Sequence, residues 1–100
     1  TGGIKVQTEE VEKILRPCIK GGFVITAVPH PRLGEAIVLL IEPVNNPAIL
    51  KKEIEQLLPR YQRPVHILVV EAVPQTRSGK IDRAAAKKMA TKKVSLPDSI

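Results

Sequence analysis

The segment PQTRSGKIDR, residues 74–83, holds the side chains of this sequence that are best suited to chemistry. It follows an apolar run and contains Gly79 followed by Lys80, a pair that often marks a phosphate-binding loop. A Walker A loop needs G-x-x-x-x-G-K-[ST], but Pro74 replaces its first glycine and Ile81 replaces its magnesium-binding hydroxyl. Because proline has no backbone N–H, it is a poor part of an anion-binding nest. Two interpretations remain: an exposed turn with incidental charge, or a loop that delivers one lysine to a reaction.

The positive charge of the chain is concentrated near its C-terminal end. The net charge is +6, which can indicate an anionic partner. Much of the excess comes from Arg83, Lys87, Lys88, Lys92 and Lys93. Since Phe23 and Tyr61 are the only aromatic residues, the chain lacks the stacking surface that single-stranded nucleic acids require. We therefore expect no nucleic-acid partner, and keep a stand-alone basic nucleic-acid-binding module only as an alternative.

Cysteine and histidine are too scarce for a disulfide or a zinc site. The single cysteine, Cys18, excludes an intramolecular disulfide and fits a reducing, cytoplasmic location. With only His30 and His66 besides it, we expect no metal ligands in this chain. No apolar run reaches the roughly 20 residues of a membrane span, and no signal peptide is visible. The chain opens at TGGIKV without a methionine, which suggests a piece of a longer protein.

Hydrophobic periodicity predicts three helices and three strands in one small domain. The first helix should begin with Thr8 as its N-cap, and its apolar face should consist of Val11, Ile14, Leu15 and Cys18. The runs 23–28, 35–42 and 65–70 are rich in β-branched residues and predict strands, of which the first is buried on both faces. The short loop between the first two strands favours antiparallel pairing.

The remaining helices have clear start signals. Asn46 should cap a helix with Pro47 in its first turn and an apolar face formed by Ile49, Leu50, Ile54, Leu57 and Leu58. Asp82 should cap the last helix, and residues 91–100 should form a flexible polar tail. The fold class is therefore α+β: a small, mainly antiparallel three-stranded sheet with three helices packed on it, plus an N-terminal edge segment.

Four segments together resemble a known family. The pattern P-x-x-x-x-G-K-x-x-R is matched at Pro74, Gly79, Lys80 and Arg83. GGIKVQTEEVE, VPHPRLGEA and LLPRYQRP occur before it in the expected order and spacing. This set resembles the C-terminal signature of the adenylate-forming enzymes, which include acyl-CoA synthetases, peptide-synthetase adenylation domains and luciferases. One position departs from the pattern, because His30 stands where the family usually has aspartate.

The resemblance implies a function for the whole protein and a role for its last domain. Residues 1–100 would be the mobile C-terminal domain of an AMP-forming acyl-CoA synthetase, and the isolated domain should be inactive. ATP, Mg²⁺ and the carboxylic acid would be bound mainly by an N-terminal domain outside this chain. Lys80 would be the catalytic cation of acyl-adenylate formation, with Gly79 and Arg83 supporting the loop and nucleotide. Glu10 and Glu12 are assigned to the electrostatics of the helix N-terminus.

The resemblance assigns the second half-reaction, in which a thiol displaces AMP from the acyl-adenylate to give a thioester, to the start of the chain. Gly2, Gly3, Ile4 and Lys5 would form one edge of the tunnel through which coenzyme A (CoA) enters. The GGIKV opening and the short length look most like the o-succinylbenzoate–CoA ligases of menaquinone biosynthesis. The alternative within the family is a peptide-synthetase adenylation domain that loads a carrier protein.

Overall fold

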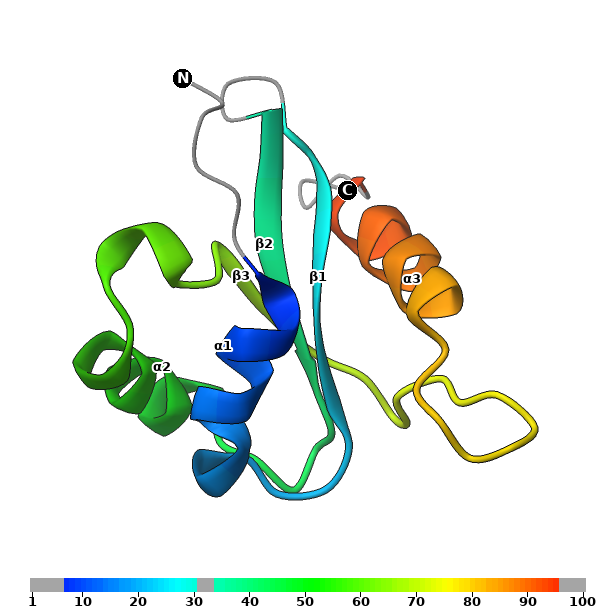
Figure 1. Cartoon of the computed structure of the whole chain (residues 1–100), viewed down its shortest axis with the longest axis horizontal. Coiled ribbons are helices and arrows are strands. Elements are labelled where there is room, and N and C mark those ends of the chain that lie inside the picture. Colours follow the sequence, from blue (N-terminus) through cyan, green and yellow to red (C-terminus); the bar gives the residue numbers. More distant parts are fainter. Residues whose placement is uncertain (1–6, 31–33, 96–100) are drawn as a thin grey trace.

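The protein has three layers, with a sheet between helices. The computed structural model describes residues 7–30 and 34–95. Helices α1 and α2 cover one face of the sheet and helix α3 covers the other (Figure 1). The elements are α1 (Thr8–Leu15), β1 (Phe23–His30), β2 (Gly34–Ile41), α2 (Pro47–Leu57), β3 (His66–Val69) and α3 (Arg83–Ser95), with short 3₁₀ turns at Arg16–Cys18 and Arg60–Gln62. None of the helices in the described ranges is long and apolar enough to cross a membrane.

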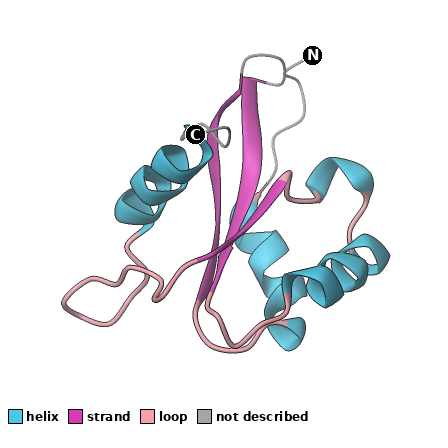
Figure 2. Ribbon diagram, turned by 180° about the vertical axis from the view of Figure 1, so that it is seen from behind, coloured by secondary structure: helices cyan, strands magenta, loops and turns pink. Residues whose placement is uncertain are grey.

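The sheet has the order β1-β2-β3 (Figure 2). Strands β1 and β2 are antiparallel, with Ile25 opposite Leu39, whereas β3 runs parallel to β2. A parallel neighbour needs a long crossover connection, and α2 lies in that connection. The predicted α+β class and the antiparallel pairing of the first two strands are confirmed, and the parallel β3 makes the sheet a mixed one. The N-terminal edge segment lies outside the described residues.

Alternating residues of β1 and β2 face two separate cores. Phe23 and Ile25 pack under α1 and α2, whereas Val24 and Val28 pack under α3. Burial on both faces, predicted for the first strand, is therefore confirmed. The larger core contains Val11, Leu15, Ile19, Phe23, Ile25, Leu39, Ile41, Leu50, Ile54 and Leu58.

Helix α1 begins at Thr8, one residue earlier than a cap at Thr8 would predict. The carbonyl of Gln7 accepts from the N–H groups of Glu10 and Val11, so Gln7 is the N-cap residue and Thr8 is the first helical residue. The prediction of Thr8 as the cap was wrong. Val11 and Leu15 are fully buried as expected, but the side chain of Ile14 is 41 % exposed.

Helices α2 and α3 have the predicted caps but different extents. The Asn46 side chain accepts from the N–H groups of Ala48 and Ile49, and the Asp82 carboxylate accepts from that of Ala85. Of the predicted α2 face, Ile49 and Leu57 are exposed. Helix α3 continues to Ser95 although a tail was expected from residue 91, and the rest of that tail lies outside the described residues. It packs on the sheet through two fully buried alanines, Ala86 and Ala90.

Candidate functional site

The segment between β3 and α3 folds into a small hairpin that extends away from the helices and sheet (Figure 1). Gln75 and Ile81 form an antiparallel bridge. The Thr76 N–H donates to the Lys80 carbonyl at 2.7 Å, and the Asp82 N–H donates to the Pro74 carbonyl at 3.0 Å. We call residues 74–82 the lysine loop. This hairpin form is compatible with both interpretations of the sequence, an exposed turn with incidental charge and a loop that presents one lysine.

Gly79 is required by the turn at the tip of this loop. Its N–H donates to the Thr76 carbonyl at 3.0 Å, and its φ is +86°. A turn followed by a left-handed residue is the usual form of a three-residue hairpin loop, and glycine adopts this conformation without steric cost. A Cβ added at Gly79 would meet nothing within 4 Å. The need for glycine is therefore conformational, and not a matter of space within this domain.

Lys80 lies at the closing position of the hairpin. Its backbone N–H also contacts the Thr76 hydroxyl at 3.3 Å, and that hydroxyl is 3.0 Å from the Ser78 hydroxyl. All residues from 75 to 80 are exposed. Within the part of the chain that the structure describes, no hydrogen bond or ion pair holds the Lys80 ammonium. The backbone of Lys80 is thus fixed while its charge is available to a group outside this chain.

A carboxylate at the end of β2 holds the incoming end of the lysine loop. Glu42 accepts from the N–H groups of Gly22 and Val73, each at 3.2 Å. A Cβ at Gly21 would lie 2.7 Å from a Glu42 oxygen, so the glycine pair gives this carboxylate its space. Sequence reasoning missed Glu42, because its partners lie far from it along the chain and both are backbone groups.

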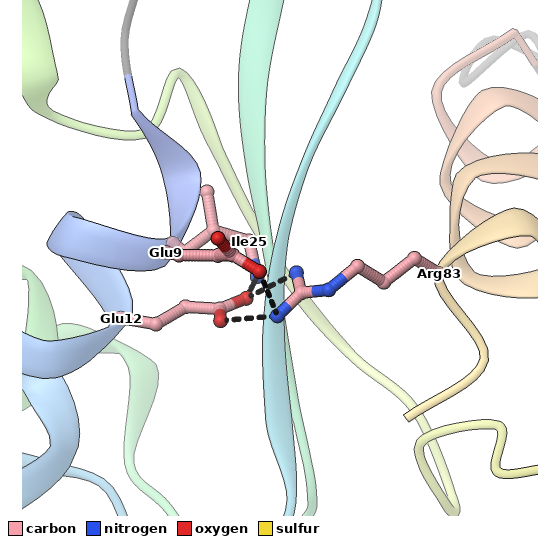
Figure 3. A network of polar contacts seen from close by, with 4 residues as sticks. All are labelled: Glu9, Glu12, Ile25 and Arg83. Carbon is pink, nitrogen blue, oxygen red and sulfur yellow. Dashed lines mark hydrogen bonds and ion pairs between the residues drawn. The ribbon is translucent and has the colours of Figure 1, made fainter. Parts of the chain in front are cut away.

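A second carboxylate, that of Glu12 on α1, holds the outgoing end of the lysine loop (Figure 3). The guanidinium of Arg83 donates to both Glu12 oxygens, at 2.8 and 3.0 Å. The same Glu12 Oε2 accepts from the backbone N–H of Ile25 at 2.8 Å, and Glu9 lies 3.9 Å from the guanidinium. The hydrogen bond from Arg83 to Glu12 raises the pKa of the guanidinium, and burial opposes the rise.

The position of Glu12 follows from the edge of the sheet. Among the described strands β1 pairs with β2 alone, so the Ile25 N–H points to an open edge and needs another acceptor. Glu12 supplies it, but its side chain is buried and a buried carboxylate needs a countercharge. Arg83 supplies that countercharge from the other face of the sheet. Assigning Glu12 to helix electrostatics was therefore wrong, and because Arg83 lies 71 positions away, no local pattern could have shown the ion pair.

The structure thus brings some of the predicted site residues together and separates others. Gly79 and Lys80 share the tip of the lysine loop, whereas the Arg83 guanidinium is directed to Glu12. The expected CoA edge, Gly2, Gly3, Ile4 and Lys5, lies outside the described residues. In the ranges 7–30 and 34–95, no group of three or more His, Cys, Asp or Glu side chains could hold a metal ion.

Cys18 lies away from the lysine loop, on the side of the molecule where α1 and α2 pack. It lines an open hollow of about 310 Å³ together with Lys20, Asn45 and Glu53. Burial raises the pKa of its thiol, and the nearby Glu53 carboxylate raises it further. A raised pKa lowers the thiolate fraction, so this environment does not favour a nucleophile.

Comparisons with known proteins agree on one family. A sequence model of the AMP-binding enzyme C-terminal domain matches residues 21–80, more than half of the chain. The trans-cinnamate:CoA ligase of Petunia hybrida is 30 % identical over 96 residues, which cover 90 % of this chain and 17 % of the relative. The phenyloxazoline synthase MbtB of Mycobacterium sp. (strain MCS) is 34 % identical over 90 residues, or 83 % of this chain and 8 % of the relative.

A solved structure gives the same result. The acyl-CoA synthetase (AMP-forming)/AMP-acid ligase II-like protein of Dyadobacter fermentans matches with a TM-score of 0.75 and 26 % identity, over 91 % of this chain and 28 % of that one. This chain therefore spans only a small part of the relatives that it matches.

Proposed function

Because this chain belongs to the AMP-binding enzyme C-terminal domain family, we propose that residues 1–100 form the mobile C-terminal domain of an AMP-forming acid–CoA ligase. In the proposed reaction, a carboxylate attacks the α-phosphate of ATP, which gives an acyl-adenylate and pyrophosphate. The thiol of CoA then attacks the acyl carbon, which gives a thioester and AMP. This domain would take a different pose for each half-reaction, and alone it should not turn over.

The observation that carries this proposal is the exposed position of Lys80 on a preformed hairpin. When a carboxylate approaches the α-phosphate, two anions meet and negative charge accumulates. An ammonium on a flexible stem is a compact charge that can contact oxygens of both groups. One such donor contributes on the order of 3 kcal/mol to transition-state stabilisation, or roughly a hundredfold or more in rate. Lys80 would act as a permanent cation and not as an acid or base.

The binding of ATP, the acid and CoA is assigned to an N-terminal domain outside this chain and to the first residues of this one. An N-terminal domain, outside this chain, would bind most of the ATP, its Mg²⁺ and the acid. Gly2, Gly3 and Ile4 would let the narrow thiol arm of CoA pass, and Lys5 would meet its phosphates. On the resemblance of the GGIKV segment, o-succinylbenzoate is the first acid to test. A cytoplasmic location rests on the single cysteine.

The test uses the full-length enzyme with Lys80→Ala. ATP–pyrophosphate exchange measures acyl-adenylate formation, and thioester formation from supplied acyl-adenylate measures the second half-reaction. We expect Lys80→Ala to lose at least about a hundredfold in exchange while the second half-reaction continues. The control is Lys52→Ala, which removes an exposed lysine from α2 and should change neither rate. If exchange survives in Lys80→Ala, the role of Lys80 is wrong.

The acceptor and the binding alternatives need separate assays. Free CoA and a phosphopantetheinylated carrier protein are supplied in parallel, and faster transfer to the carrier would favour the peptide-synthetase alternative. Labelled DNA is titrated with the chain at physiological salt, where tight binding would contradict the ligase proposal.

A further inference from the structure

We propose that Glu12 and Arg83 are positioning residues that set the direction of the lysine loop, so that breaking their ion pair selectively slows acyl-adenylate formation. This inference rests on the role of Lys80 proposed above. Both residues lie outside the segment 21–80 that matches the family model. Neither needs to touch a substrate for this role, because they act through the backbone that carries Lys80.

The backbone between Lys80 and Arg83 is fixed at each residue. Ile81 is paired with Gln75 and packs against the core under α3. Asp82 donates its N–H to the Pro74 carbonyl and accepts from the Ala85 N–H, each at 3.0 Å. Because each intervening residue is held on both sides, a movement of the first turn of α3 moves the hairpin tip with it.

Apart from the ion pair, the first turn of helix α3 is held on the sheet by one buried side chain, that of Ala86. Farther along the helix Ala90 is also buried, and Met89 and Val94 pack, partly buried, against the same core. Alanine buries little area and does not interlock with neighbouring side chains, so it resists sliding poorly. The start of α3 therefore needs another constraint on its direction.

The ion pair supplies that constraint across the edge of the sheet (Figure 3). Arg83 forms two parallel N–H···O bonds to Glu12, and this arrangement fixes orientation as well as distance. Glu12 is itself fixed by the Ile25 N–H and is only 5 % exposed. The Glu12 carboxylate on α1 thus contacts both the backbone of β1 and the residue that begins α3.

The experiment measures both half-reactions in the full-length enzyme with Glu12→Gln and, separately, Arg83→Met. Glutamine keeps an acceptor for Ile25 but lacks the charge, and methionine keeps the apolar stem of arginine. We expect adenylate formation to fall about tenfold to a hundredfold, since misplacement of a catalytic group by about 1 Å has effects of this size. The KM values for ATP and acid should not change, and thioester formation from supplied acyl-adenylate should stay near the wild-type rate.

The matched control is Asn46→Ala. It removes two capping hydrogen bonds from α2, on the other side of the molecule, and so destabilises the domain without touching the lysine loop. Both half-reactions should be unchanged in this variant at a temperature where it is folded. If Asn46→Ala reduces adenylate formation as much as Arg83→Met does, the ion pair has only a general structural role and the inference is overturned.

A second readout does not depend on activity. Hydrogen–deuterium exchange of peptides covering residues 74–82 should become faster in Arg83→Met and Glu12→Gln, but not in Asn46→Ala. An unchanged rate of hydrogen–deuterium exchange in the loop would overturn the inference. If Lys80→Ala retains adenylate formation, the proposed function fails, and the hydrogen–deuterium exchange measurement still decides whether the ion pair holds the loop.

Discussion

Replacing Gly79 by alanine tests whether the shape of the lysine loop depends on a left-handed residue at its tip. The φ of Gly79 is +86°, a conformation that costs an ordinary L-residue about 1–2 kcal/mol. A Cβ at this position meets nothing within 4 Å, so no steric contribution is added. We therefore expect Gly79→Ala to lower the free energy of unfolding by about 1–2 kcal/mol through the backbone alone.

The chain contains a matched control for this substitution. Gly34, at the start of β2, has a φ of +81°, and a Cβ there also meets nothing within 4 Å. Gly34→Ala should therefore cost the same free energy at a site away from the lysine loop. Thermal unfolding of the chain by circular dichroism measures both, and each kcal/mol should lower Tm by about 4–8 °C in a domain of this size. Asparagine, which tolerates this conformation better, should cost less than alanine at both positions.

The two variants should differ in function. In the full-length enzyme, Gly79→Ala displaces the backbone of Lys80 and should slow ATP–pyrophosphate exchange by about tenfold or more. Gly34→Ala should leave that rate unchanged. If both variants slow exchange equally, or if alanine at Gly79 costs no stability, the reasoning from the hairpin geometry is refuted.

Two further predictions concern the other face of the molecule. Ile54→Ala should lower the free energy of unfolding by about 2–5 kcal/mol, because Ile54 is only 2 % exposed. Ile49→Ala should change it by less than about 0.5 kcal/mol, because Ile49 is 60 % exposed. Urea unfolding measures both free energies, and equal costs would contradict the observed buried face of α2. Since burial raises the pKa of the Cys18 thiol, its thiolate fraction near neutral pH is small, and iodoacetamide should alkylate it more slowly than it alkylates free cysteine. The rate should rise with pH beyond the point at which free cysteine levels off, and alkylation as fast as that of free cysteine would be the contrary result.

The elements that could be predicted from the sequence have local signals. Asn46 followed by Pro47, and Asp82 before an alanine-rich run, mark helix starts through groups only a few residues apart. The runs that form β1 and β2 were equally visible because much of both their faces is buried, whereas β3, which is only partly buried, was visible from its β-branched residues. The turn at the tip of the lysine loop also has a local signal, because a turn position with positive φ is most often occupied by glycine.

The features that were missed depend on contacts between distant parts of the chain. Arg83 and Glu12 are 71 positions apart, so no local pattern could pair them. Glu42 bonds two backbone groups, which have no sequence signature. The periodicity of α2 marked Ile49 and Leu57 as core, but the buried stripe is narrower than the apolar one. The role of Lys80 itself stays a prediction, since its proposed partners are outside this chain.

The rigidity of the lysine loop bears on whether a single lysine can be useful to another domain. Fixing the backbone of one residue costs roughly 1–2 kcal/mol, so ordering the segment Thr76–Lys80 on entry into a cleft would cost more than the ~3 kcal/mol that one cationic donor contributes. A disordered loop would therefore contribute no net free energy to transition-state stabilisation. In this domain the hydrogen bonds between Thr76 and Lys80 order that segment beforehand. Glu42 and Glu12 hold the residues that flank the whole lysine loop, Val73 and Arg83. Only the lysine side chain is left to be ordered, at about 2 kcal/mol of rotamer entropy, which is less than the donor contributes. A preformed hairpin is thus a physical requirement of the proposed mechanism.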